Sequence, residues 1–164
     1  MTMRKLFLLI LINTSLFFYS CAGAVKTYDK NMTSVWNKNN VYAVLPFINY
    51  TETPQAGKRV ASLLYAIMIS KGYKIEDNII YIKSKNLRSM EKKAFKHGAD
   101  YVVTGTVNEY RYKTGIDGQP AVSISLLVIN KDNKVVWSGT GSKTGFINSS
   151  LGKITTELLK NMIP

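Results

Sequence analysis

The chain has 164 residues, of which 46% are hydrophobic and 20% charged, and its formal net charge is +12. These values predict one folded domain behind a removable leader and exclude a mainly disordered chain. One cysteine and one histidine exclude an internal disulfide framework and a multi-histidine metal site, and the positive charge indicates acidic partners.

The first 24 residues have the pattern of a secretory signal peptide. Arg4 and Lys5 precede an apolar stretch, and small residues follow it. The apolar stretch is too short and too interrupted to favour a membrane-spanning helix. We therefore expect an exported protein. In the envelope we expect no nucleic-acid partner, so the acidic partner is anionic lipid or another envelope protein.

Cys21 is the only cysteine, and it lies between Ser20 and the small residues Ala22 and Gly23. This stretch resembles a bacterial lipobox, which implies that residues 1–20 are a signal peptide and that a lipidated Cys21 begins the mature protein. The absence of aspartate after the cysteine then implies sorting to the outer membrane, with the domain in the periplasm. The alternative is cleavage after Ala24, which would discard Cys21 and leave a soluble protein.

Residues 21–40 are polar and rich in asparagine and lysine, so we expect a flexible tether, with Val35 and Trp36 docking on the domain. The domain itself should span residues 41–164.

The domain is predicted to begin with a strand and a helix. Residues 41–49 are apolar at alternate positions on both faces, which indicates a strand covered on both sides. Thr53 followed by Pro54 is typical of a helix N-cap and first helical position, and Gly72 is a stop signal.

A short second strand over residues 73–76 and a second helix over residues 84–97 follow. The second helix should turn four side chains inward: Leu87, Met90, Ala94 and Phe95. Its outer face carries four basic residues, Lys85, Arg88, Lys92 and Lys96. We interpret this basic face either as an ordinary solvated surface or as a contact for anionic lipid or an acidic partner.

Residues 99–145 contain three extended runs separated by turns, which predict an antiparallel meander. A final helix from about residue 148 should close the core, with an apolar stripe formed by Ile147, Leu151, Ile154, Leu158 and Met162. The predicted class is therefore α/β (α+β), with one mixed sheet of about five strands in the order β-α-β-α-β-β-β-α.

Four segments together resemble a superfamily of bacterial envelope lipoproteins: VYAVLPFIN, the helix ending in KGY, HGADYVVTGTVNEY, and SISLLVINKDNKVVWSGTGSKTG. The superfamily includes the curli secretion lipoprotein CsgG, the penicillin-binding-protein activator LpoB and the flagellar lipoprotein FlgO. The resemblance covers residues 41–164 and implies a fold more than an activity. The predicted elements leave no room for the long membrane-crossing hairpins of a channel subunit, which disfavours that role.

The sequence contains no recognisable catalytic constellation, and we expect neither a catalytic residue nor a metal or cofactor. Residues 139–145 are glycine-rich, but the spacing of Gly, Lys and Thr fails the phosphate-loop pattern. His97 precedes Gly98 at a predicted helix end, where its ring complements the helix dipole.

These observations favour a non-enzymatic outer-membrane lipoprotein that acts as an adaptor or scaffold in flagellar or cell-wall machinery. Self-association of the chain into homo-oligomers is compatible with this role. The alternative is an activator of a peptidoglycan synthase. A secretion-channel subunit and a soluble secreted binding module are less favoured.

Overall fold

The computed structural model describes residues 24–29, 35–76, 86–113 and 118–164 of the chain. Its strands are β1 (Ala24–Asp29), β2 (Val41–Val44), β3 (Ile48–Asn49), β4 (Lys74–Ile75), β5 (Tyr101–Tyr112), β6 (Pro120–Asn130) and β7 (Val135–Thr144). Its helices are α3 (Ala56–Ser70), α4 (Leu87–Lys96) and α5 (Leu151–Met162).

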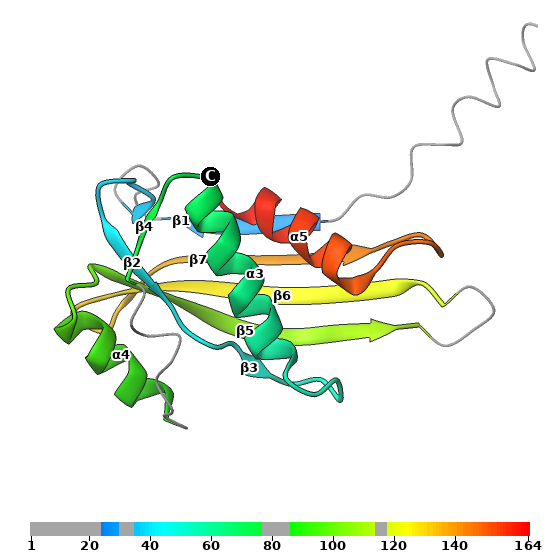
Figure 1. Cartoon of the computed structure of the whole chain (residues 1–164), viewed down its shortest axis with the longest axis horizontal. Coiled ribbons are helices and arrows are strands. Elements are labelled where there is room, and N and C mark those ends of the chain that lie inside the picture. The colour runs from blue at the N-terminus through cyan, green and yellow to red at the C-terminus, as the bar shows by residue number, and fades with distance from the viewer. Residues whose placement is uncertain (1–23, 30–34, 77–85, 114–117) are drawn as a thin grey trace, which may run out of the picture.

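All of these strands form one mixed sheet of seven strands, six of them in the order β1-β7-β6-β5-β2-β4, with β3 beside β5 (Figure 1). Strands β1, β7, β6 and β5 are antiparallel neighbours, whereas β2, β3 and β4 are joined by parallel pairing. The α/β class and the C-terminal meander are confirmed. The sheet exceeds the expected five strands because β1 was not expected and residues 41–49 form two strands.

The meander follows from the alternation of its sequence. On β6, Ile124, Leu126 and Val128 are fully buried, while Ser123 and Ser125 between them are partly exposed. The turn between β6 and β7 is closed by the amide of Asn130, which donates to the carbonyl oxygen of Lys134 at 3.0 Å. Asn133 there has a φ of 59°, a left-handed conformation that asparagine tolerates better than most residues.

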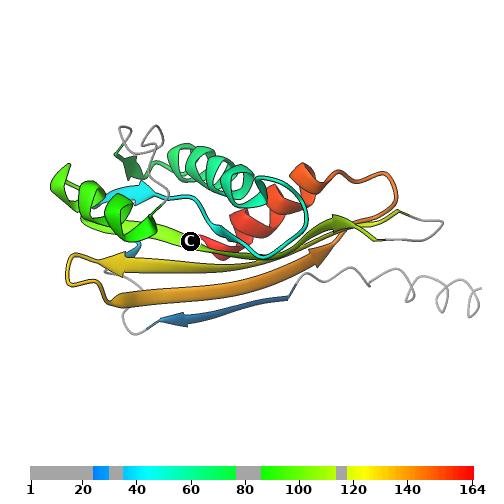
Figure 2. The same ribbon diagram turned by 90° about the horizontal axis from the view of Figure 1, so that it is seen from below.

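Apolar side chains pack on both faces of the sheet. Helices α3 and α5 lie side by side over one face (Figures 1 and 2) and cover the larger cluster, which includes Tyr42, Val44, Val103, Leu126 and Leu158. Helix α4 covers the smaller cluster on the opposite face, formed by Ala43, Leu45, Met90, Ala94, Ala99, Val102 and Ile129. Strand β2 is therefore covered on both sides, as predicted.

Phe47 packs in the larger cluster with Tyr42 and Val44, although strict alternation from Leu45, two positions earlier, would place it in the smaller cluster. Pro46 lies in the irregular stretch between β2 and β3, where the missing amide donor interrupts the strand and resets the alternation.

The structure differs from the expected tether over residues 21–40. Ala24–Asp29 forms β1, which pairs with β7 from Ala24 opposite Ser142 to Asp29 opposite Trp137. The physical reason is that β7 would otherwise leave an unpaired row of backbone donors and acceptors along the sheet edge. The expected docking of Val35 and Trp36 is confirmed, because both side chains are buried in the larger cluster.

Trp36 joins an aromatic group within that cluster. Its ring centroid lies 5.0 Å from that of Trp137 in an edge-to-face arrangement and 5.8 Å from that of Tyr73. The hydroxyl of Tyr42 donates to the carbonyl oxygens of Val35 at 2.6 Å and Asn37 at 2.8 Å. Burial raises the pKa of Tyr42 above its usual range, so it stays a neutral donor.

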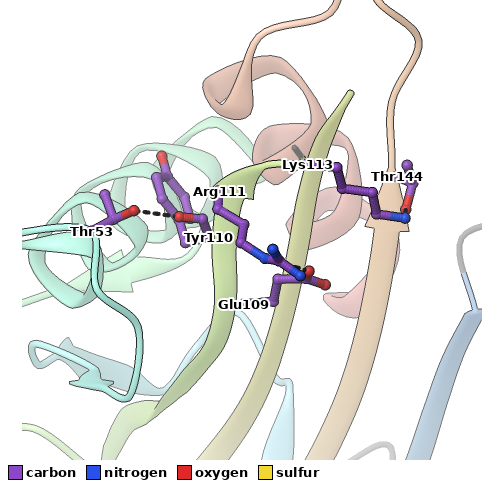
Figure 3. Close-up of polar contacts among 6 residues, drawn as sticks. All are labelled: Thr53, Glu109, Tyr110, Arg111, Lys113 and Thr144. Atoms are coloured by element: carbon purple, nitrogen blue, oxygen red, sulfur yellow. Dashed lines mark hydrogen bonds and ion pairs between the residues drawn. The ribbon is translucent and has the colours of Figure 1, made fainter. Parts of the chain in front are cut away.

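The predicted cap of the first helix is wrong. Helix α3 begins at Ala56, after Gln55 in a left-handed conformation with φ of 59°, and no side chain caps it. The hydroxyl of Thr53 instead donates to the carbonyl oxygen of Tyr110 on β5 at 2.5 Å, as Figure 3 shows. A tertiary contact has displaced the local cap. The predicted stop is confirmed, because Gly72 has a φ of 83°.

The other two helices lie close to the predicted positions. Asn86 caps α4 by accepting from the amide of Arg88 at 3.0 Å, and Met90 and Ala94 are buried. Ser150 caps α5, and Ile154, Leu158 and Met162 are buried as predicted. Ile147 is not part of this stripe: it lies before the helix and is exposed.

Candidate functional site

Two of the residues singled out in the sequence, Cys21 and Lys85, lie outside the described residues. The sequence position of Cys21 still limits its distance from the fold, because β1 begins three positions later at Ala24. Three residues span about 10 Å when fully extended. The backbone position at which any lipid on Cys21 is attached is therefore held within about 10 Å of the start of β1.

The end of the sheet at which β1 starts is defined by backbone pairing. Ala24 lies opposite Ser142 near the end of β7, and the amide of Gly145 donates to the carbonyl oxygen of Pro120 at the start of β6 at 2.8 Å. Tyr112 at the end of β5 is in turn the register partner of Pro120. The start of β1, the end of β7, the end of β5 and the start of β6 thus lie at one end, which we call the anchor end (Figure 1).

The anchor end exposes apolar side chains. Phe146 and Ile147, in the connection from β7 to α5, are 68% and 59% exposed, and Tyr112 is half exposed. The hydroxyl of Tyr112 accepts from the amide of Leu151 at 3.4 Å, which ties this ring to the first turn of α5. Exposed aromatic and aliphatic side chains grouped in this way mark a contact surface.

Basic side chains accompany this apolar group. The ammonium of Lys113 donates to the hydroxyl of Thr144 at 3.4 Å, and Arg111 forms a 3.1 Å ion pair with Glu109 (Figure 3). Lys113 and Lys153 are both exposed. Aromatic rings with nearby lysines are typical of surfaces that lie at the interface of a membrane with anionic headgroups.

The basic face predicted on the second helix lies elsewhere. Arg88, Lys92 and Lys96 are exposed on α4, which packs over β2 and the start of β5. Strand β5 starts there and ends at Tyr112, so α4 lies at the end of the sheet opposite the anchor end (Figure 1). The structure therefore separates the basic helix face from the anchor end by the length of the meander.

Glu91 on α4 was missed by sequence reasoning. Its side chain is buried between the exposed basic residues and the smaller apolar cluster. Burial raises the pKa of Glu91, and the nearby positive charge of Arg88 partly opposes this shift. No sequence signal distinguishes it from the other charged residues of this helix.

The glycine-rich stretch near the C-terminal end of the meander is part of β7 up to Thr144. Lys143 points toward α5, where its ammonium lies 3.1 Å from a carboxylate oxygen of Glu157. A backbone in strand conformation cannot wrap around a phosphate, and Lys143 is held in an ion pair. His97 is the C-cap residue of α4, at the helix end where it was predicted.

Within the described ranges, no three side chains of histidine, cysteine, aspartate or glutamate are grouped so that they could hold a metal ion. In the same ranges, no helix is both long enough and apolar enough to cross a bilayer.

No protein-family model matches the chain, and no curated protein matches it significantly. Solved structures do match. The lipoprotein GNA1162 from Neisseria meningitidis is 20% identical, with a TM-score of 0.57 over 72% of this chain and 94% of that chain. The protein XCC0632 from Xanthomonas campestris is 11% identical, with a TM-score of 0.51 over 80% of this chain and 86% of that one.

These two likenesses define the class: the chain has a fold that occurs in a bacterial lipoprotein. A third match is more specific. The PelC dodecamer from Paraburkholderia phytofirmans has subunits that are 30% identical to this chain, with a TM-score of 0.69 over 86% of this chain and 94% of that chain. The chain belongs to the PelC family.

Proposed function

We propose that the chain is a non-enzymatic lipoprotein of the bacterial envelope, anchored by acyl chains on Cys21 in the outer membrane, with its domain in the periplasm. In this position it acts as an adaptor or scaffold, and several copies assemble together. This wider role is the one that the resemblance to CsgG, LpoB and FlgO implies.

The observation that carries the anchor is the short connection between Cys21 and β1. Acyl chains held within about 10 Å of Ala24 bring the anchor end against the membrane. Phe146, Ile147 and Tyr112 are exposed at this same end. Their contact with the headgroup region would remove apolar surface from water at about 25 cal/mol per Å².

The observation that supports assembly is the family relationship. PelC of Paraburkholderia phytofirmans is a dodecamer, and the match includes nearly all of its chain. Subunits of one family that share a fold over their whole length commonly share the surfaces used for symmetric assembly.

The position of α4 favours a protein partner over lipid for its basic face. Arg88, Lys92 and Lys96 lie at the end of the sheet away from the anchor, and Debye screening removes most attraction to a membrane beyond about 8–10 Å. An acidic component of flagellar or cell-wall machinery fits this surface. Activation of a peptidoglycan synthase stays a second prediction, which a synthase rate assay with added protein would test.

A photo-crosslinking experiment tests the orientation. The full-length chain is made in bacterial cells with benzoylphenylalanine at Phe146 or, as the matched control at the far end, at Lys92. After irradiation, mass spectrometry should find phospholipid attached to the probe at position 146 and none at position 92. Lipid at 92 with none at 146 would contradict the proposed orientation.

A further inference from the structure

Helix α4 presents a row of positive charge to solvent. Arg88, Lys92 and Lys96 follow one another at intervals of four residues, so they lie along one side of the helix, and all three are exposed. We call these three residues the basic row. Lys93 is exposed beside them, whereas Glu91, the one acidic residue of α4, is buried. The charge that this helix exposes is therefore entirely positive.

The basic row forms no ion pair within the described residues. The ion pairs of this part of the chain all have their cation on a strand or on the turn between strands: Arg111 with Glu109, Lys131 with Asp100, and Lys143 with Glu157. Like charges four positions apart on a helix destabilise it. The row is therefore arranged as expected where the counter-charge comes from another molecule.

The helix dipole explains only part of this pattern. Lys93 and Lys96 lie in the last turn of α4, where positive charge complements the negative end of the helix. Arg88 lies in the first turn, where the positive end of the dipole opposes a cation, and this turn contains no acidic residue. Lys92 lies between the two ends. Helix stability thus does not account for Arg88 and Lys92, whereas contact with an anion does.

The turn between β6 and β7 extends the positive surface beyond the end of α4. Lys131 in this turn lies 2.9 Å from one carboxylate oxygen of Asp100, close after the helix, and the other oxygen accepts from the amide of Val41 at 3.0 Å (Figures 1 and 2). Asp100 is therefore occupied and does not neutralise α4. The exposed acid of the turn is Asp132, and the exposed Lys134 offsets its charge.

The surroundings of the basic row differ from a usual interface between folded domains. Such interfaces have aromatic or large apolar side chains at their centre and few lysines. None of the large apolar side chains that are exposed in the described residues belongs to α4, and Val135 is the one next to the β6–β7 turn. The row therefore suits a partner that binds through charge and brings little apolar surface.

The spacing of the basic row fits an extended peptide. Four residues of an α-helix rise about 6 Å. Alternate residues of an extended chain, which point to the same side, are about 6.6 Å apart. Acidic side chains at alternate positions can therefore each meet one member of the row. Acidic segments of this kind do not fold alone, and clusters of basic side chains recognise them.

We infer that an extended acidic segment of another envelope protein binds along α4, with its carboxylates on Arg88, Lys92 and Lys96 and with Lys93 beside them. The inference rests on the adaptor role and the orientation proposed above. It adds the surface that the partner occupies and the form and charge of the segment that binds there.

The test uses the full-length protein in a neutral detergent and a fluorescent peptide in which glutamate alternates with serine. Fluorescence anisotropy measures binding. The variant Arg88→Gln/Lys92→Gln/Lys96→Gln removes the basic row, and we expect it to raise Kd by about tenfold or more, because three contacting charges are lost together.

The matched control is Lys58→Gln/Arg59→Gln/Lys153→Gln, which removes the same number of exposed cations from α3 and α5. It should change Kd by less than about threefold, because only the screened long-range field is altered. Thermal unfolding of both variants checks that they are folded. Absence of binding by the wild type, or a basic-row variant that binds no more weakly than the control, overturns the inference.

A polysaccharide is the competing partner, and the same titration with polygalacturonate tests it. We expect the basic-row substitutions to weaken the peptide more than this polymer of carboxylate-bearing sugars. Tighter binding of polygalacturonate than of the peptide at equal carboxylate concentration would overturn a peptide as the occupant.

A second measurement, in cells, applies even if the basic-row variant does not fold. Benzoylphenylalanine replaces the exposed Lys93 in the full-length chain, and mass spectrometry identifies the segment attached after irradiation. Aspartate and glutamate should outnumber lysine and arginine in this segment. A protein segment without this excess overturns the inference and leaves the adaptor role in place, whereas the absence of any crosslinked protein also overturns the protein partner proposed for α4.

Discussion

At the scale of single residues, Gly105 shows why the segment ADYVVTG is a strong fold signal. A Cβ atom built at Gly105 would lie 1.9 Å from the carbonyl oxygen of Ser125 and 2.9 Å from the ring of Phe47. The neighbouring strand is backbone and cannot move aside without breaking the ladder. Glycine is required here by close approach, in the centre of the longest strand.

We predict that Gly105→Ala destabilises the fold by about 2–3 kcal/mol, because it overpacks a backbone contact. The control is Gly152→Ala on α5, where the nearest atom to a new Cβ is 4.0 Å away and alanine should stabilise the helix by about 0.5–1 kcal/mol. Chemical denaturation measures both. Equal effects of the two substitutions would contradict the close approach seen at Gly105.

Glu91 provides a pH-dependent prediction. Burial raises the pKa of Glu91, so the folded chain binds this proton more tightly than the unfolded chain. The contribution of this group to stability is therefore complete below the unfolded pKa of about 4.3 and is lost as the pH rises through the folded pKa.

Glu91→Gln should consequently raise the free energy of unfolding at pH 7 by about 0.5 kcal/mol, and with it the melting temperature. Near pH 4 the substitution should have no effect on either. Thermal unfolding at both pH values measures the difference. A variant that is less stable than wild type at pH 7 would show that the carboxylate is better solvated than its burial indicates.

Residue-level prediction from sequence succeeded where the signal was local. Gly72 and Gly98 were recognised as helix stops, and both have positive φ values of 83° and 102°. The cap predicted at Thr53 was wrong, because its hydroxyl donates to the carbonyl oxygen of Tyr110, which lies 57 positions away in the chain. The role of a side chain that bonds at such a distance depends on the fold and not on its neighbours in sequence.

At the scale of elements, the C-terminal end of α5 is joined to the C-terminal end of α3 by one lysine. The ammonium of Lys71 donates to the carbonyl oxygens of Lys160 at 3.1 Å, Ile163 and Pro164 at 3.3 Å. Tyr73 adds a bond from its hydroxyl to Pro164 at 3.0 Å. Burial lowers the pKa of Lys71, and the positive charges of Lys160 and Lys38 lower it further.

We predict that Lys71→Met destabilises the fold by about 1–2 kcal/mol, because the carbonyl groups at the end of α5 lose a cationic donor. The matched control is Lys58→Met, at an exposed position of the same helix, which should change stability by less than about 0.5 kcal/mol. Hydrogen exchange at the last turn of α5 should rise in the first variant only. Unchanged exchange in both would show that packing alone holds this turn.

The periodic elements were predictable and the sheet edge was not. Strands β5, β6 and β7 and the stripe on α5 carry their burial pattern in their sequence. Strand β1 does not, because what it gains is backbone pairing with β7, a feature that is independent of its side chains. The candidate anchor end could not be assembled from sequence for the same reason: only strand pairing brings Tyr112 and Phe146 to the same end of the sheet.

At the scale of the whole molecule, the sheet gives the chain two different ends and two different faces. The anchor end carries exposed apolar side chains next to the start of β1, and the far end carries α4 with its basic residues. One face is covered by α3 and α5, and α4 covers part of the other. In the proposed orientation, a lipid on Cys21 would hold the anchor end at the membrane and leave α4 facing away from it.

The sequence alone predicted an export signal and a lipid site at Cys21, because both predictions rest on local composition. It did not supply the closeness of Cys21 to the anchor end, which depends on the pairing of Ala24 with Ser142. It also did not supply the family, which the comparison of folds identified.

Native mass spectrometry of the wild-type chain released from bacterial membranes tests the account most directly, because one spectrum reports both the subunit and the assembly. We predict subunits that begin at Cys21 and carry acyl chains, in complexes whose mass is a whole-number multiple of that subunit. A single unmodified chain that begins at Val25 would contradict both the anchor and the assembly.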